Sequence, residues 1–182
     1  MKNVKKLLAV LLMLCLLAAM ATVLSACGSE KENSKSAETS GSEQEDPYSP
    51  EGVVEDYLKA FNDRDAEKIV DLSYSKPEQE HYKNECDEDK NDLINNLKEG
   101  FENRDRGYGD DWKFKDIQIK KVNDVKGDEF KSLQKVCEDE YDMKITDAKV
   151  VNVSFTIGGK DYEEDLEDEL TVYKYDGKWY LY

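Results

Sequence analysis

The chain has 182 residues, 37% of them charged, and its 42 aspartates and glutamates outnumber its 26 lysines and arginines, giving a formal net charge of −16. Binding to nucleic-acid phosphates depends on basic patches that release counterions, so this excess of acid argues against a nucleic-acid partner. An acidic surface keeps a domain in solution and away from anionic lipid, and cation binding is the alternative use of the charge.

The first 26 residues have the pattern of a secretion signal. Three lysines among the first six residues precede an apolar run over residues 7–24, which only Thr22 interrupts, and this order is typical of exported proteins. The run ends in Leu24-Ser25-Ala26-Cys27, which resembles the lipobox of bacterial lipoprotein signals. The resemblance implies cleavage before Cys27 and a diacylglyceryl group on its thiol. The alternative is an uncleaved membrane anchor, because about 18 apolar residues can just span a bilayer.

Cleavage would leave residues 27–49 as a lipidated tether. Two or three acyl chains such as palmitate hold a protein on a membrane stably, where one holds it marginally, so we expect the chain on the extracytoplasmic face of the cell membrane. Loss of the signal removes three lysines and no acid, which takes the formal net charge from −16 to −19. Apart from Pro47, the only apolar side chains of the tether are Ala37 and Tyr48, too few to drive folding. A flexible chain of this length spans about 25 Å, and residues 50–182 remain as one domain.

Helical patterns open this domain. Ser49-Pro50-Glu51 predicts a helix start, because serine caps free amides, proline fits the first turn and glutamate faces the positive end of the helix dipole. The apolar stripe that follows contains Val53, Val54, Tyr57, Leu58 and Phe61. Asp65 can cap a short second helix that turns Ile69, Val70 and Leu72 inward. A third helix is predicted from about Pro77 to Asn103, since residues 104–109 are too polar and glycine-rich to continue it.

Strand patterns with a period of two dominate the second half. Trp112 and Phe114 alternate, and Ile117 and Ile119 then alternate in the opposite phase, which predicts a β-bulge near Lys115-Asp116. A helical segment over residues 130–141 follows. The next strand covers residues 151–157 and ends at a pair of glycines.

A hairpin is predicted at the C-terminus, where Asp176-Gly177 is a strong two-residue turn signal. If Tyr175 pairs with Lys178, then Val172 lies opposite Leu181 and Tyr173 lies opposite Tyr180. Helices first and antiparallel strands last predict an α+β domain with N-terminal helices packed on one face of a curved antiparallel sheet.

Three segments resemble lipoprotein domains of the nuclear transport factor 2-like superfamily. They are the opening PEGVVEDYLKAF at residues 50–61, the turn DRDAEK at residues 63–68, and the closing DGKWYL at residues 176–181. The resemblance implies a cone, in which a curved sheet wraps around helices and leaves an open mouth. The superfamily includes ketosteroid isomerase-like and dehydratase-like enzymes beside members that only bind or assemble, so the fold does not decide the function.

No catalytic residue is assigned from the sequence. An isomerase-type pocket needs a carboxylate base and a neutral Tyr and Asp donor pair, and no residues of this chain can be singled out for these roles. His81, the only histidine, lies in a polar helical stretch and is predicted to be solvated, with a catalytic base as the alternative. A hydrolase triad would need a nucleophile motif, and the sequence has no Gly-x-Ser-x-Gly.

No metal site or cofactor is predicted. Residues 87–98 begin like a calcium loop, but Asp92 stands where glycine is needed and Lys98 where the bidentate acid is needed. The acidic run at residues 163–169 could gather calcium loosely, although a charged edge strand that prevents aggregation is the preferred interpretation. Zinc lacks ligands, because the chain has one histidine and few cysteines.

Cys86 and Cys137 are the only cysteines left once Cys15 is removed with the signal and Cys27 is lipidated. One pair in an exported domain predicts a disulfide, which would be worth about 4 kcal/mol for a loop of this length in the chain-entropy model. Two separate buried thiols are the alternative.

The function predicted from these observations is a membrane-tethered, noncatalytic binding or interaction module. Its cone mouth or a tyrosine face would engage a peptide, a cell-wall fragment or a partner protein. The alternatives are a small-molecule enzyme of the isomerase or dehydratase type, and a structural role beside a transporter or a cell-wall enzyme.

Overall fold

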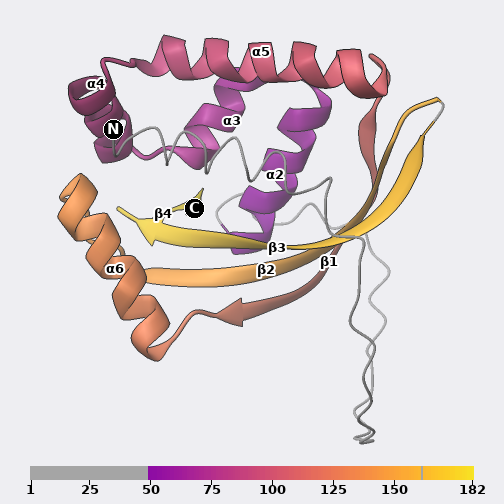
Figure 1. The fold of residues 1–182 in the computed structure, drawn as a ribbon. Helices are drawn as coiled ribbons and strands as arrows, with labels where there is room; N and C mark the ends of the chain where they lie inside the picture. Colours follow the sequence, from indigo (N-terminus) through magenta and orange to yellow (C-terminus); the bar gives the residue numbers. More distant parts are fainter. Residues whose placement is uncertain (1–48, 161) are drawn as a thin grey trace, which may run out of the picture. The chain divides into compact units, whose positions relative to one another are not determined.

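A four-stranded antiparallel sheet with helices packed against it forms the part of the chain that the computed structural model describes, residues 49–160 and 162–182 (Figure 1). The predicted α+β class is confirmed. The predicted signal peptide, the lipobox with Cys27 and nearly all of the predicted tether lie outside the described residues. Within them, no helix has the length and apolar content needed to cross a membrane.

The first two helices form as the sequence predicts. Helix α2 spans Pro50–Asn62, and the Ser49 hydroxyl accepts a hydrogen bond from the Gly52 amide at 2.9 Å. Helix α3 spans Ala66–Ser73, and the Asp65 carboxylate accepts from the Lys68 amide at 3.0 Å. Arg64 between them adopts a left-handed φ of 57°, which reverses the chain in a short turn.

The single helix predicted for residues 77–103 is wrong, because two helices occupy this region. Helix α4 spans Lys76–Cys86 and helix α5 spans Lys90–Tyr108. Asp87 ends α4 with a left-handed φ of 58°, and Asp89 caps α5 in a capping box with Asp92. The aspartates of the apparent calcium loop are thus helix caps. The predicted stop at residue 104 is also wrong, since α5 continues to Tyr108 and ends at Gly109, where φ is 91°.

The strands lie in the sheet in sequence order. Strand β1 (Lys113–Asp124) is followed by helix α6 (Gly127–Tyr141) and then by strands β2 (Asp147–Gly158), β3 (Glu163–Tyr175) and β4 (Lys178–Leu181). The predicted bulge is confirmed, because the β1–β2 register shifts between Lys115 and Gln118, and Asp116 has a φ of 51°. A second shift between Ile119 and Lys121 has no clear signal in the sequence.

The C-terminal hairpin has the predicted register. Tyr175 pairs with Lys178, Tyr173 with Tyr180, and Val172 with Leu181. Both turn residues have positive φ, 48° at Asp176 and 77° at Gly177, as a tight two-residue hairpin requires. Strand β4 is much shorter than β3, so among the described residues only the last part of β3 has a partner strand on that side.

Two regions of the core lie within the described residues. On one side, Phe61 of α2 contacts Phe101 of α5 and Phe114 of β1, with ring centroids 5.3 Å and 5.9 Å apart. Figure 1 shows α5 lying across α2 and α3, with α4 and α6 near the end of the sheet that carries β4. The other region lies there, and its buried residues are Val125, Leu133, Cys137, Met143, Ile145, Ala148 and Tyr173.

Candidate functional site

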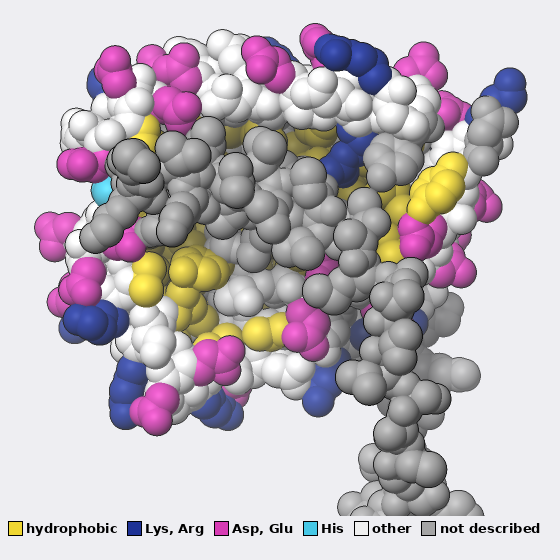
Figure 2. Space-filling model, in the orientation of Figure 1, with side chains coloured by type: hydrophobic (Ala, Val, Ile, Leu, Met, Phe, Trp, Pro, Cys, Tyr) yellow, Lys and Arg dark blue, Asp and Glu magenta, His cyan; other side chains and the backbone are white. Residues whose placement is uncertain are grey.

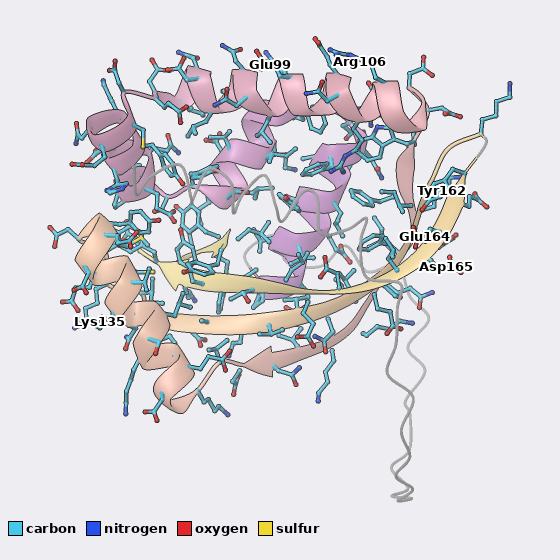
Figure 3. The ribbon with its side chains drawn as sticks, in the orientation of Figure 1. Glu99, Arg106, Lys135, Tyr162, Glu164 and Asp165 are labelled. Carbon is cyan, nitrogen blue, oxygen red and sulfur yellow. The ribbon has the colours of Figure 1, made fainter. Side chains whose placement is uncertain are left out.

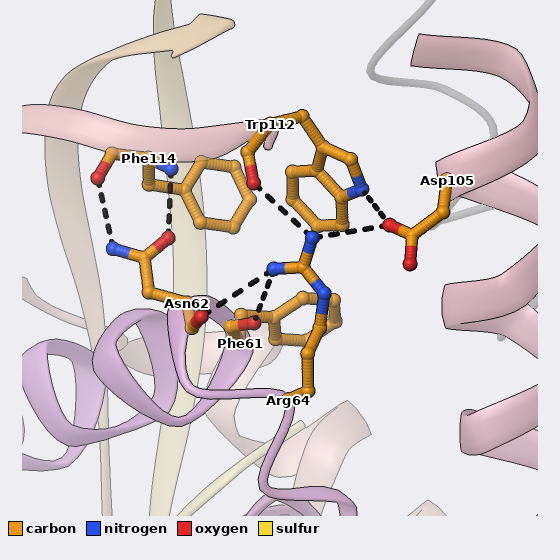
Figure 4. Close-up of polar contacts among 6 residues, drawn as sticks. All are labelled: Phe61, Asn62, Arg64, Asp105, Trp112 and Phe114. Carbon is orange, nitrogen blue, oxygen red and sulfur yellow. Dashed lines mark hydrogen bonds and ion pairs between the residues drawn. The ribbon is translucent and has the colours of Figure 1, made fainter. Parts of the chain in front are cut away.

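An arginine between two helices is the centre of one polar cluster (Figure 4). The Arg64 Nη2 donates to an Asp105 carboxylate oxygen at 3.1 Å and to the Trp112 carbonyl at 3.3 Å. Its guanidinium carbon lies 4.3 Å from the Trp112 ring centroid, a cation–π distance. The Trp112 indole N–H donates to the same Asp105 oxygen at 2.7 Å, and Trp112 is 0% exposed.

A neighbouring amide completes this cluster. Asn62 exchanges two hydrogen bonds of 2.8 Å with the backbone of Phe114, donating one and accepting one. The Arg64–Trp112 cluster therefore ties the α2–α3 turn and the end of α5 to the start of β1. Because its polar groups satisfy one another around a buried indole, its role is to hold these elements together.

A buried carboxyl group, which sequence reasoning missed, lies at the other end of the sheet. Glu78 is the only buried residue of α4 and is 6% exposed. One of its oxygens accepts from the Ser75 amide at 2.7 Å, from the Ser75 hydroxyl at 2.8 Å, and from the Tyr173 hydroxyl of β3. The sequence Ser75-Lys76-Pro77-Glu78 has the capping-box pattern, which indicates a helix start but not burial.

Opposing effects set the pKa of Glu78, and two effects act together on the pKa of Tyr173. Burial raises the pKa of the Glu78 carboxyl, and the hydrogen bonds from Tyr173 and Ser75 lower it by a smaller amount. Burial, followed by the nearby Glu78 charge, raises the pKa of Tyr173 far above its ordinary value. Tyr173 is therefore a permanent donor, and a neutral Glu78 is favoured more than at the surface. The Glu78 oxygen that Tyr173 contacts already accepts from three donors. This oxygen is therefore poorly placed to act as a base.

A groove lies between α4 and α6 and has a volume of about 410 Å³. The His81 ring of α4 stands perpendicular to the Tyr141 ring of α6, with centroids 5.1 Å apart. The remaining lining residues are mostly acidic; they are Pro77, Glu80, Asn84, Glu138, Asp139, Glu140 and Asp142. Of these acids, Asp139 pairs with Lys135 at 3.0 Å. Figure 2 shows acidic side chains around the edge formed by α4 and α6, with the histidine between them.

A second hollow, of about 270 Å³, lies on β1, β2 and β3. Two pairs of its polar side chains are engaged with each other. Lys120 donates to Gln118 at 2.7 Å and Thr156 donates to Asp165 at 2.6 Å. This hollow is therefore a weaker candidate for binding than the α4–α6 groove.

A third polar group lies on the helix-facing side of the sheet. Asp168 pairs in register with the buried Val153 of β2. Burial raises the pKa of Tyr57 on α2 to about 12, while Arg104 of α5 lowers it and Asp168 raises it. The guanidinium carbon of Arg104 lies 4.9 Å from the Trp112 ring centroid. An aspartate of β3 and an arginine of α5 thus both lie within electrostatic range of a protonated tyrosine on α2.

The acidic run over residues 163–169 belongs to β3, at the end of the sheet away from α6 (Figure 3). Glu163 pairs with Lys115 at 2.6 Å, and Glu164 accepts from the Tyr162 hydroxyl. Among the residues that the structure describes, no three His, Cys, Asp or Glu side chains are grouped so that they could hold a metal ion.

The remaining residues singled out from the sequence are His81, Cys86 and Cys137. His81 is half-buried and lies in the wall of the α4–α6 groove. The expected disulfide is not formed in the structure, where Cys86 is an exposed free thiol at the end of α4 and Cys137 is a buried free thiol on α6. Burial raises the pKa of Cys137 to about 11. Both positions are on helical stripes, but only Cys137 faces the core.

No protein-family model matches this chain. No curated protein matches it either.

Proposed function

We propose that this chain is a membrane-anchored extracytoplasmic lipoprotein whose domain is a noncatalytic binding module, with the α4–α6 groove as its binding face. The ligand we propose is an arginine- or lysine-bearing segment of a partner protein. The observation that carries the proposal is the composition of the groove, which combines five acidic side chains with the His81 and Tyr141 rings.

Charge and aromatic rings favour a cationic ligand for two reasons. Carboxylates form charge-assisted hydrogen bonds with guanidinium and ammonium groups, and the face of a tyrosine ring attracts a cation. The formal net charge, which is −16 for the whole chain and −19 once the signal is removed, adds a long-range attraction that speeds encounters with basic partners and weakens with salt.

The proposal also includes the lipid anchor and the cone fold. The Leu24-Ser25-Ala26-Cys27 sequence supports lipidation at Cys27. The helices α2, α3 and α5 on one side of a bent antiparallel sheet support a nuclear transport factor 2-like cone, to which α4 and α6 would be additions (Figure 1).

The runner-up is an isomerase- or dehydratase-type enzyme, and the group on the helix-facing side of the sheet favours it. Asp168 could serve as the base and Tyr57 as the donor, with Arg104 beside them. An enclosed apolar cavity at Asp168 in a ligand-bound crystal structure would support the enzyme. A cone filled by side chains there would support the binding module.

Crosslinking of the native lipoprotein on cells tests the proposed binding face. The variant Glu80→Gln/Glu138→Gln removes two charges of the groove, and Glu99→Gln on the outer side of α5 is the control (Figure 3). Two exposed ion pairs of about 0.5 kcal/mol each predict a loss of affinity on the order of fivefold. We expect the groove variant to yield up to about fivefold less crosslinked partner than the wild type, and the control to match the wild type. Equal crosslinking of the two variants would rule the groove out.

A further inference from the structure

Helix α4 is attached to the rest of the domain in an unusual way. A surface helix is normally held by an apolar stripe on its inner face. In α4 (Lys76–Cys86) the buried residue is Glu78, and the aromatic residues His81 and Tyr82 are half-buried. The attachment of this helix to the sheet therefore depends on a group that can gain or lose a proton.

A single carboxyl oxygen joins the two parts. It accepts two hydrogen bonds from Ser75, at the start of α4, and one from Tyr173, a 0% exposed residue of β3. The Tyr173 ring stacks on Tyr180 with centroids 5.6 Å apart, so it has little freedom to follow a moving helix. The Ser75 hydroxyl also lies 3.2 Å from the Met143 sulfur. Because a hydroxyl has one proton, Ser75 can donate either to Glu78 or to Met143.

The surroundings of Glu78 favour the neutral carboxyl. The titratable groups that interact with its charge come from the end of α3, from α4, from α6 and from the last two strands. They are Tyr74, Tyr82, Cys137, Tyr141, Tyr173, Tyr180 and Tyr182. None of these groups carries a compensating positive charge at neutral pH. The donors to Glu78 and the positive end of the α4 dipole stabilise the ionised carboxylate in place.

We propose that Glu78 is a proton-dependent latch, which holds α4 on the sheet when the carboxyl is neutral and lets α4 detach when the proton is lost to solvent. Detachment places the carboxylate in water and breaks its contact with Tyr173. Because burial raises the pKa of Glu78 in the docked form, docking is favoured at low pH and is lost as the pH rises through that raised pKa.

The latch also regulates the proposed binding face, because α4 forms one wall of the α4–α6 groove. This consequence rests on the proposed function. The latch itself rests on the contacts of Glu78 and holds whether or not the groove binds a ligand.

Alkylation of Cys137 reports the opening. Cys137 is 0% exposed, and the nearby Glu78 charge contributes to its raised pKa, whereas Cys86 is exposed. The rate at each thiol of the intact protein is followed by peptide mass spectrometry from pH 5 to pH 8. Each rate is divided by the rate in the unfolded chain at the same pH, so that the titration of the thiols cancels.

We expect the corrected Cys137 rate to rise with pH and the corrected Cys86 rate to stay level. Each pKa unit between the docked and detached forms multiplies the opening equilibrium by about ten. The glutamine in Glu78→Gln cannot ionise, so the corrected alkylation rate of Cys137 should stay low from pH 5 to pH 8. In Glu80→Gln, on the same helix, this rate should rise with pH as it does in the wild type. Tyr173→Phe removes a donor to the docked carboxylate and should enlarge the rise.

A level Cys137 profile in the wild type, or the same rise in Glu78→Gln, would overturn the latch. If Glu78→Gln does not fold, hydrogen exchange of the wild type decides. Amides of α4, corrected for intrinsic exchange, must then accelerate with pH relative to those of α2. Binding of a lysine-rich peptide separates the two proposals. If the corrected Cys137 rate rises with pH but peptide binding does not change with pH, the latch stands and its effect on the groove is refuted. If Glu80→Gln/Glu138→Gln does not weaken peptide binding, the proposed function alone is contradicted.

Discussion

Replacement of Trp112 by alanine should remove a large part of the stability of the domain. The side chain is 0% exposed, donates to Asp105 at 2.7 Å and packs against the Arg64 guanidinium at 4.3 Å. Truncation of a buried tryptophan costs about 3–5 kcal/mol, and loss of the hydrogen bond to a charged partner adds about 1.5 kcal/mol. The free energy of unfolding of a domain is only about 5–15 kcal/mol. The Trp112→Ala variant should therefore be only marginally stable.

Urea unfolding followed by circular dichroism measures this loss. With a slope of about 2 kcal/mol per molar urea, a loss of about 5 kcal/mol lowers the urea midpoint by about 2.5 M. Trp112→Phe keeps a ring but removes the indole donor, and should cost about 1–3 kcal/mol. Its neighbour Lys113 is exposed, so Lys113→Ala should stay within about 0.5 kcal/mol of the wild type. A stable Trp112→Ala, within about 1 kcal/mol of the wild type, would refute the assignment of this cluster as a structural junction.

Four further predictions concern separate regions of the chain. Trp179 is 6% exposed, so Trp179→Ala should cost about 3–5 kcal/mol, and a melting curve close to that of the wild type would contradict its burial. Because the pKa of Glu78 is raised in the folded state, the unfolding free energy of the wild type should fall from pH 5 to pH 8 by more than that of Glu78→Gln; parallel urea profiles would contradict this. A Cβ at Gly158 would overlap the Tyr162 carbonyl, whereas one at Gly100 in α5 meets nothing within 4 Å, so thermal unfolding should show Gly158→Ala destabilised and Gly100→Ala stabilised by about 0.5–1 kcal/mol. Cys27→Ser should abolish lipid labelling and leave the precursor uncut, and unchanged labelling would exclude the lipobox.

Local sequence signals predicted the helix starts and the hairpin well. Ser49 and Asp65 cap their helices with their own side chains, and a cap acts within three residues. The Asp176-Gly177 turn favoured the register in which Tyr175 pairs with Lys178, and that register is confirmed. These features depend on contacts between neighbours in the chain, so a single sequence suffices to predict them.

The division between α4 and α5 shows how a local signal can be misinterpreted. Asp89 and Asp92 form a capping box, but in an acidic stretch the same residues also suggest a calcium loop. Apolar residues at helical spacing continue on both sides of the break, so periodicity alone predicts one helix. The left-handed φ of 58° at Asp87 is accessible to aspartate without being required by it.

The sequence by itself determined the α+β class, the first helices, the bulge and the hairpin register, because each follows from periodicity, caps or turns. Only the tertiary structure decided which polar residues are buried. Glu78 and Tyr173 are 95 positions apart, and neither has a local pattern that distinguishes it from the many exposed acids and the other tyrosines. Tertiary contacts remove water from Glu78, and burial is the largest cause of its raised pKa. The groove likewise exists only because α4 and α6, which are separated in the chain by helix α5 and strand β1, lie side by side.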